Sequence, residues 1–252
     1  MALLEPLQLI VHRKPAQACG SLYDRPVSET SADAGPVQSR TQFERLIATD
    51  ELAGRTIGGF AAVAIGLRGV DLDGVAIDKL DLRDADADAA RLERATLRFV
   101  DGRKSQWPGA LWHRVQASDC DLTEINLQGA HVLRCEFGPV RMARAQFAGA
   151  RICSTSFKDS EMYGANFAGA MLMKVSFEGY SGSTVSLSRV DFSGASLFEV
   201  DFKRANMYGA NLRGASLLRC DLRGVNLSTA DLSGARLVGC LSHGADLDDA
   251  TW

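Results

Sequence analysis

No apolar run in the 252-residue sequence reaches the roughly 18 residues that span a bilayer, and the opening residues lack the basic start and long apolar core of a secretion signal. The six cysteines include no Cys-x-x-Cys pair and are too sparse for a secreted disulfide scaffold, while the four scattered histidines argue against a zinc site. Lys and Arg total 28 against 31 Asp and Glu, so the net charge of -3 gives no overall attraction to nucleic acid or anionic membrane. These absences predict a soluble, cytoplasmic protein with no metal, no cofactor, no membrane span and no direct binding of nucleic acid.

What the sequence does contain is a period of five residues. Large apolar residues recur at every fifth position from Leu67 to Leu247, and about 32 of about 37 such sites are filled this way. Two residues before almost all of them lies a small apolar residue, as in Ala210 before Leu212 and Ala230 before Leu232. The pattern fits neither a helix, which needs apolar residues at i, i+3 and i+4, nor an alternating strand.

A spacing of two points the small and the large residue to the same side, as in a short strand, and the Gly or polar residues that follow allow a sharp turn. Four such units form a square coil of about 20 residues, and successive coils would stack about 4.8 Å apart. The repeated Asp or Asn just before each large residue is expected to make turn hydrogen bonds at the corners rather than to act in catalysis.

The motif Ala-[Asp/Asn]-[Leu/Phe]-x-Gly, written for example as Ala210-Asn211-Leu212-Arg213-Gly214, resembles that of the pentapeptide-repeat family. The resemblance covers roughly residues 61–252. It implies an all-β, right-handed quadrilateral parallel β-helix, with the large residue stacked inside and the small one beside it.

Three segments are expected along the chain. Residues 1–40 do not repeat and form an arm or linker, in which Leu3–Val11 is apolar enough for a strand; an extended arm, a secretion or docking signal and plain disorder all remain open. Residues 41–60 form a helical cap, with a capping box of Thr41 and Glu44 opening a helix over about Gln42 to Ala53. Residues 61–252 form the β-helix.

Inside the coils, a 20-residue period predicts ladders of stacked side chains. The expected core residues are Phe137, Phe157 and Phe177 on one side, Phe147 and Phe167 on another, Leu212 and Leu232 further along, and Trp252 as a plug for the last coil. The repeat is disturbed at 99–118, which contains Trp107 and Trp112, and at 178–188, where Tyr180 and Gly182 break the pattern. Each disturbance is either a distorted coil or a loop whose length is a multiple of five.

Outward positions carry two apolar stripes where polar residues are usual. The same period places Phe198, Leu218 and Val238 on one side, and Leu133, Cys153 and Met173 on the adjacent side. A run of outward apolar residues suggests a contact surface, so we expect partner binding at these six positions.

Enzyme chemistry needs converging groups in a cavity, which a solid rod does not offer, so the chain is not expected to be an enzyme. The function predicted is a protein-binding scaffold or adaptor, with the partner unidentified and a homodimer through the C-terminal coils as one option. An accessory factor of a secretion machine or a secreted effector would fit this class. The alternative, implied by the family resemblance, is a DNA mimic that binds DNA gyrase and confers quinolone or toxin resistance. Against it, residues 61–252 carry 24 acidic and 22 basic residues, too balanced for the sustained negative field of DNA.

Overall fold

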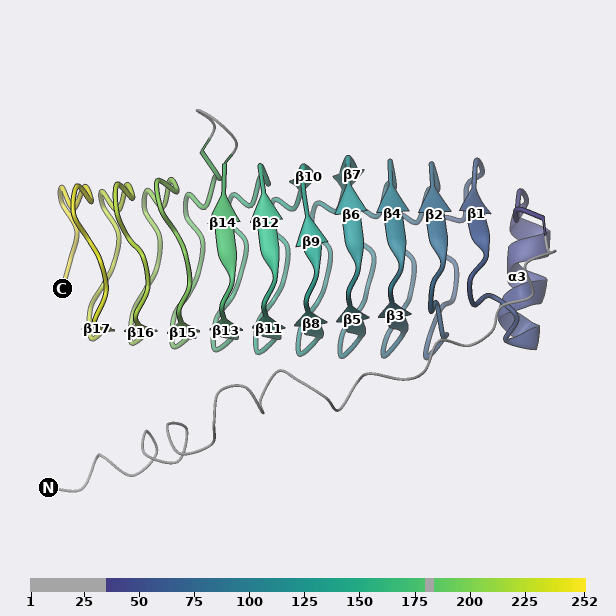
Figure 1. The fold of residues 1–252 in the computed structure, drawn as a ribbon, viewed down its shortest axis with the longest axis horizontal. Helices are drawn as coiled ribbons and strands as arrows, with labels where there is room; N and C mark the ends of the chain where they lie inside the picture. The colour runs from purple at the N-terminus through teal and green to yellow at the C-terminus, as the bar shows by residue number, and fades with distance from the viewer. Residues whose placement is uncertain (1–34, 180–183) are drawn as a thin grey trace, which may run out of the picture.

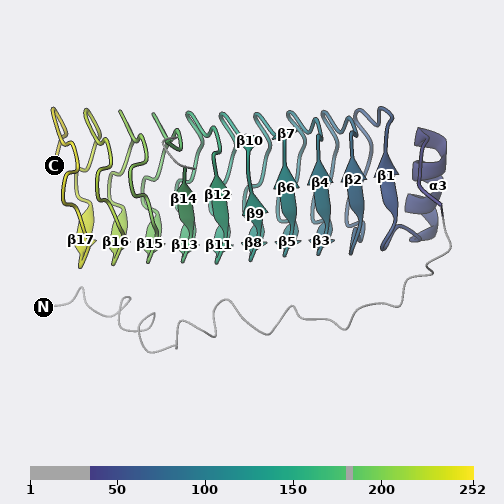
Figure 2. The same ribbon diagram turned by 45° about the horizontal axis from the view of Figure 1, so that its top comes forward.

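The computed structural model describes residues 35–179 and 184–252, which form a rod of stacked parallel coils closed at one end by a helix (Figure 1). Figure 2 shows the same stack turned by 45° about the horizontal axis, so that its top comes forward. The Leu3–Val11 segment, Tyr180 and Gly182 lie outside the described residues.

Each coil has four sides of five residues, and the middle residue of each side points inward. The aspartate or asparagine before it turns the chain by accepting a hydrogen bond from the backbone two residues on, as Asp191 does from Ser193 N at 2.8 Å and Asp231 from Ser233 N at 2.9 Å. These carboxylates therefore serve the corners of the coil, as the repeat predicts.

Two sides of the coil are regular enough to form parallel sheets. The seven-stranded sheet contains β1 (Thr56–Gly58), β2 (Ala76–Asp78), β4 (Thr96–Arg98), β6 (Gln116–Ser118), β9 (Glu136–Phe137), β12 (Ser156–Lys158) and β14 (Ser176–Glu178). The eight-stranded sheet contains β3 (Arg91–Glu93), β5 (Leu111–His113), β8 (His131–Leu133), β11 (Arg151–Cys153), β13 (Met171–Met173), β15 (Ser196–Phe198), β16 (Ser216–Leu218) and β17 (Arg236–Val238). A third side carries the short pair β7 (Cys120–Asp121) and β10 (Val140–Arg141), and isolated bridges complete the coils.

The strand register shows which of the two predicted alternatives, a distorted coil or an inserted loop, applies to each disturbed region. Residues 99–118 form a regular coil, because Leu111 pairs with His131 and Gln116 with Glu136, each 20 positions apart. At the second region the step becomes 25, since Glu161 pairs with Ser186 and Met171 with Ser196. Five extra residues are therefore inserted between β14 and Ser186.

The interior is filled by two ladders of stacked phenylalanine rings. Phe137, Phe157 and Phe177 stack at 5.0 and 5.2 Å between ring centroids, and Phe147 stacks on Phe167 at 4.7 Å with the planes 2° apart. The ladders continue across the insertion through Phe202 and Phe192 and meet edge to face, as at 6.3 Å between Phe167 and Phe177. Leu212 and Leu232 are buried in the same core. The stacking follows from the parallel in-register strands, which place like residues directly over one another.

A pair of tryptophans fills the interior where the repeat has Gly102 and Ala117 at large-residue sites. Trp107 and Trp112 are buried and meet edge to face at 5.4 Å. The Trp107 indole N–H donates to Ser105 Oγ at 2.9 Å, and this hydroxyl donates to the Gly102 carbonyl at 2.6 Å. The indole nitrogen of Trp112 is buried with no hydrogen-bond partner among the described residues.

We expect Trp107→Phe to destabilise the rod more than Trp112→Phe, by about 1 kcal/mol. Both changes remove the same ring volume, but only the first leaves the buried Ser105 hydroxyl without its donor, while the second removes an indole N–H that has no acceptor. Urea unfolding of the two variants, followed by circular dichroism, measures the difference. Equal losses would show that the hydrogen bond of Trp107 contributes nothing.

Helix α3 (Arg40–Thr49) covers the first coil, but both of its ends differ from the sequence prediction. Ser39, not Thr41, is the N-cap and accepts a hydrogen bond from Gln42 N at 3.3 Å, while Glu44 pairs with Arg40 at 2.7 Å. The helix ends at Thr49 and is capped by Asp50, which adopts the left-handed conformation, rather than continuing to Ala53. Val37 already pairs with Ile57 of β1, so the chain must turn at Ser39 and coil geometry extends upstream of residue 61.

At the other end of the rod the predicted plug is wrong. Trp252 is 67% exposed rather than buried, because no described coil stacks over the last one. Val238, Leu241 and Leu247 are exposed there for the same reason.

Candidate protein-binding surface

The outer face of the eight-stranded sheet brings together all six outward residues singled out in the sequence. In each strand the middle residue points inward, so the flanking residues project outward from the same face. The third residues of the strands form one column, because Leu133 pairs with Cys153, Cys153 with Met173, Met173 with Phe198, Phe198 with Leu218 and Leu218 with Val238. We call these six residues the apolar stripe. The strands that carry it, from β8 to β17, can be followed in order in Figure 1.

The prediction of two stripes on adjacent sides is therefore wrong. The sequence prediction used a 20-residue period throughout. Across the five-residue insertion this period assigns every later residue to the wrong side of the square, one side away from its true place. With the 25-residue step between Met173 and Phe198, the two stripes join into one.

Exposure is lowest at the N-terminal end of this stripe and highest at its C-terminal end. Leu133 and Cys153 are each only 4% exposed, although neither belongs to the interior core, whereas Val238 is 51% exposed. Met173, Phe198 and Leu218 are partly buried. The expectation that Leu133 and Cys153 are open to solvent is thus incorrect, and the accessible part of the stripe is its C-terminal half.

Upstream of Leu133 the same column becomes charged, a feature that the sequence analysis missed. Glu93 and His113 are 2% and 3% exposed, and Glu93 lies 3.0 Å from Arg94 and 3.4 Å from His113 Nδ1. Arg94 also pairs with Asp73, where burial raises the pKa of the carboxyl group. The 20-residue spacing of Glu93, His113 and Leu133 already places them in one column. The sequence prediction considered only the apolar residues of this column and so did not include Glu93 and His113.

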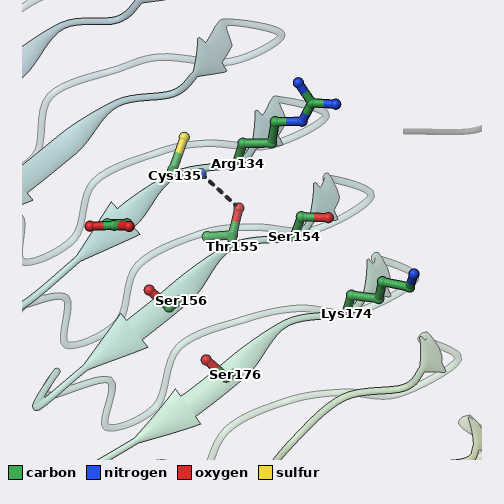
Figure 3. A pocket seen from close by; sticks show the side chains of 8 residues that line it. Arg134, Cys135, Ser154, Thr155, Ser156, Lys174 and Ser176 are labelled. Carbon is green, nitrogen blue, oxygen red and sulfur yellow. Dashed lines mark hydrogen bonds between the residues drawn. The ribbon is translucent and has the colours of Figure 1, made fainter. Parts of the chain in front are cut away.

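An open depression of about 420 Å³ lies at the corner between the two sheets (Figure 3). It is lined by Arg134, Cys135, Glu136, Ser154, Thr155, Ser156, Lys174 and Ser176. The buried Thr155 hydroxyl accepts a hydrogen bond from Cys135 N at 3.3 Å. Burial raises the pKa of the Cys135 thiol to about 12, so this thiol is a packing group and not a nucleophile.

The side opposite the eight-stranded sheet in the N-terminal half carries charge in neutralised pairs. Asp81 and Asp101 receive bidentate hydrogen bonds from Arg83 and Arg103, with the shortest at 2.6 Å, and Asp121 pairs with Arg141 at 3.0 Å. The arginine hydrogen bonds lower the pKa of Asp81 and Asp101. Because the arginines of these pairs are exposed and the aspartates only partly buried, each pair contributes little to stability, and the main effect is to cancel the acidic charge of this side.

No group of three or more His, Cys, Asp or Glu side chains in residues 35–179 and 184–252 is arranged to hold a metal ion. Helix α3 is the one helix in that part of the chain, and it is too short and polar to cross a bilayer.

Comparison with solved structures finds other repeat proteins at low similarity. HetL, a pentapeptide repeat protein involved in heterocyst differentiation regulation from Nostoc sp. strain PCC 7120, is 22% identical, with 83% of this chain and 95% of HetL covered and a TM-score of 0.34. A trypsin-treated form of QnrB1, a plasmid-mediated fluoroquinolone resistance protein, is 18% identical, with 76% and 91% covered and a TM-score of 0.44. Rfr23 from Cyanothece 51142 is 23% identical, with 54% and 90% covered and a TM-score of 0.24. A search of curated protein sequences gave no match.

The family model for pentapeptide repeats matches in 8 copies, over residues 141–179, 185–214, 205–241 and 226–251. The coils upstream of residue 141 continue the same 20-residue register, as in the pairing of β2 with β4 and of β3 with β5. The resemblance drawn from the sequence is therefore confirmed: the chain is a β-solenoid built of pentapeptide repeats.

Proposed function

We propose that this chain is a non-catalytic protein-binding scaffold whose binding surface is the accessible half of the apolar stripe. The observation that carries the proposal is the unbroken column Met173, Phe198, Leu218 and Val238 on the outside of a parallel sheet. Contiguous apolar side chains on an outer surface favour protein contact, because covering them removes apolar area from water.

A second copy of the chain is the partner that we would test first. The side chains of the column repeat at the strand spacing of about 4.8 Å, so two copies can lie face to face with like residues in contact. The flanking residues Ser196 and Ser216 are small and uncharged, which leaves Phe198 and Leu218 prominent on the face.

We expect light scattering to show a dimer for the unmodified chain and a monomer for Leu218→Arg, since the arginine would place a charge in the middle of the contact. Ala143→Arg is the matched control, because Ala143 is a partly buried outward residue on the opposite side of the rod. Both variants should retain the circular dichroism of the unmodified chain. A monomer in every case would exclude the second copy, and a purified partner whose binding is lost with Leu218→Arg but kept with Ala143→Arg would then be required to sustain the scaffold proposal.

The DNA-mimic alternative is less well supported by the surface. Binding in place of DNA needs a sustained negative field, whereas the acidic column of Asp81, Asp101 and Asp121 is paired with arginines along its length. A supercoiling assay with DNA gyrase and a quinolone tests it directly. Protection of the enzyme at sub-micromolar protein would establish the DNA mimic in place of the scaffold.

A further inference from the structure

The side of the rod opposite the eight-stranded sheet carries two exposed tyrosines in its C-terminal half. On this side the residues that follow the inward positions form an outward column, in the order Tyr163, Ser188, Tyr208, Ser228 and Asp248. Tyr163 and Tyr208 are 45% and 44% exposed, whereas Ser188 between them is partly buried. The tyrosines are two coils apart, which is about 10 Å at the usual strand spacing. Two aromatic rings therefore stand out from the surface with a small residue between them.

Each tyrosine lies beside an arginine that is positioned in the same way. The Arg189 backbone N–H donates to the Tyr208 carbonyl at 2.8 Å, and a Cβ placed on Gly209 would lie 3.6 Å from Arg189 Cγ. The stem of Arg189 thus lies along the rod, against the glycine that follows the tyrosine. Arg144 repeats this arrangement beside Tyr163, with its backbone N–H donating to the Tyr163 carbonyl at 2.8 Å.

This part of the surface also carries positive charge that no salt bridge cancels. Arg189, Lys203 and Arg204 are exposed, and none of them forms a salt bridge with another residue in the part of the chain that the structure describes. Lys203 and Arg204 lie at the corner where their coil enters the side that carries Tyr208. Together the segments 186–190, 201–210 and 221–230 of this side and corner carry four basic and two acidic residues. The N-terminal half of the same side differs, because its arginines are paired with aspartates.

The basic stretch is short, since acidic residues lie beyond both of its ends. Glu161 occupies the coil before it, and Asp246, Asp248 and Asp249 occupy the coil after it. The three coils between them span about 14 Å, a length that an extended peptide covers in about four residues. A nucleic acid strand is charged along its whole length, so it would meet repulsion at both ends of the stretch. A short acidic peptide can place its carboxylates on the basic stretch alone.

We propose that this surface, formed by Tyr163, Arg189, Lys203, Arg204 and Tyr208, binds a short, extended, acidic segment of a partner protein. Carboxylates of the segment accept hydrogen bonds from the arginine and lysine side chains, and its aliphatic atoms cover the two tyrosine rings. Arginine and tyrosine are among the residues that contribute most to binding at protein interfaces. The proposal does not depend on the function proposed above, because the apolar stripe lies on the opposite side of the rod.

Fluorescence anisotropy of labelled hexaglutamate, titrated with the full chain at low ionic strength, tests this surface. We expect saturable binding, and a Kd at least about tenfold higher for Arg189→Glu, which reverses a charge at the centre of the site. Tyr208→Ala should raise the Kd at least about threefold through the loss of ring contacts. The double change of Lys203 and Arg204 to glutamate is a second charge-reversal variant in case Arg189→Glu alters the circular dichroism of the rod.

Arg68→Glu is the matched control for net charge. Arg68 is an exposed arginine of the first coils on another side of the rod, and its replacement changes the net charge by the same amount as Arg189→Glu. Its Kd for hexaglutamate should stay within about twofold of that of the unmodified chain.

Three outcomes would overturn the proposal. The first is the lack of saturable binding of hexaglutamate by the unmodified chain. The second is a loss of binding in Arg68→Glu as large as that in Arg189→Glu, which would show that net charge alone attracts the peptide. The third is tighter binding of a labelled oligothymidylate of about twelve nucleotides that Arg189→Glu abolishes, which would assign the surface to single-stranded nucleic acid.

Discussion

The Phe157→Asp variant is expected to lose its native fold at neutral pH. Phe157 is fully buried and stacks at 5.0 Å on Phe137 and 5.2 Å on Phe177, in a column with no room for water. Truncating a buried phenylalanine costs about 3–5 kcal/mol, and the uncompensated carboxylate adds to this loss. The sum is comparable to the entire stability of a typical domain, which is about 5–15 kcal/mol. Circular dichroism and thermal melting measure the loss.

The pH dependence of stability distinguishes the effect of the buried charge from the effect of the lost aromatic ring. Burial would raise the folded-state pKa of the new carboxyl above its unfolded value of about 3.9, so the added penalty grows as the pH rises above that value and disappears below it. Phe157→Asp should therefore regain stability near pH 4 relative to Phe157→Asn, which cannot titrate. Ala148→Asp, an outward residue of the same coil, should fold normally. A Phe157→Asp chain that melts like the unmodified protein would show that this site is not in the core.

The ladders of stacked phenylalanines, on which this prediction depends, could be predicted directly from the sequence. Inward positions need large side chains that stack on like residues in the coils above and below. The 20-residue period is therefore enough to assign Phe147 and Phe157 to their sides of the coil. The turns are equally local, because an aspartate such as Asp191 bonds to the backbone two residues later. Features that depend on one coil and its neighbours were therefore predictable.

The side on which a residue lies was not predictable beyond the insertion. Five added residues preserve the five-residue phase, so the inward and outward positions after Ser186 remain correct, but each is moved by one side of the square. Only the pairing of Met173 with Phe198 shows that the two predicted stripes are one. Tyr180 and Gly182 mark the place of the shift in the sequence, but not the shift itself, because a distorted coil and an insertion of five residues leave the same five-residue phase.

The predictions for the two ends of the rod, the N-cap of the helix and the burial of Trp252, were wrong for a related reason. Ser39 with Gln42 and Thr41 with Glu44 are both acceptable capping pairs, and the choice between them is made by the pairing of Val37 with Ile57. Burial of Trp252 would need a further coil above it, which its local spacing cannot supply. In both cases the outcome is decided by contacts with a neighbouring coil, which the local spacing of the residues does not show.

Gly58→Ala is the substitution outside the ladders for which we expect the largest loss. A Cβ at this position would lie 1.7 Å from the carbonyl oxygen of Asp78 and 2.8 Å from its carbonyl carbon, both of which are backbone atoms of the paired strand β2. The clash cannot be relieved by rotating a side chain, so β1 must move away from β2. That movement breaks the stacking of Ile57 and the pairing of Val37 with β1, on which the seating of α3 depends.

The expected cost is about 3 kcal/mol or more, concentrated in the first coil because each coil of a solenoid contacts only its neighbours. Gly66→Ala is the matched control: nothing lies within 4 Å of a Cβ there and its backbone is not left-handed, so the same change should be neutral or stabilising by up to about 1 kcal/mol. Thermal melting gives the overall effect, and amide exchange should show deprotection of α3 and β1 in Gly58→Ala while β12 and β14 keep theirs. Equal behaviour of the two variants would mean that β1 has room to shift without leaving the sheet, and that the first coil is not fixed by this close approach.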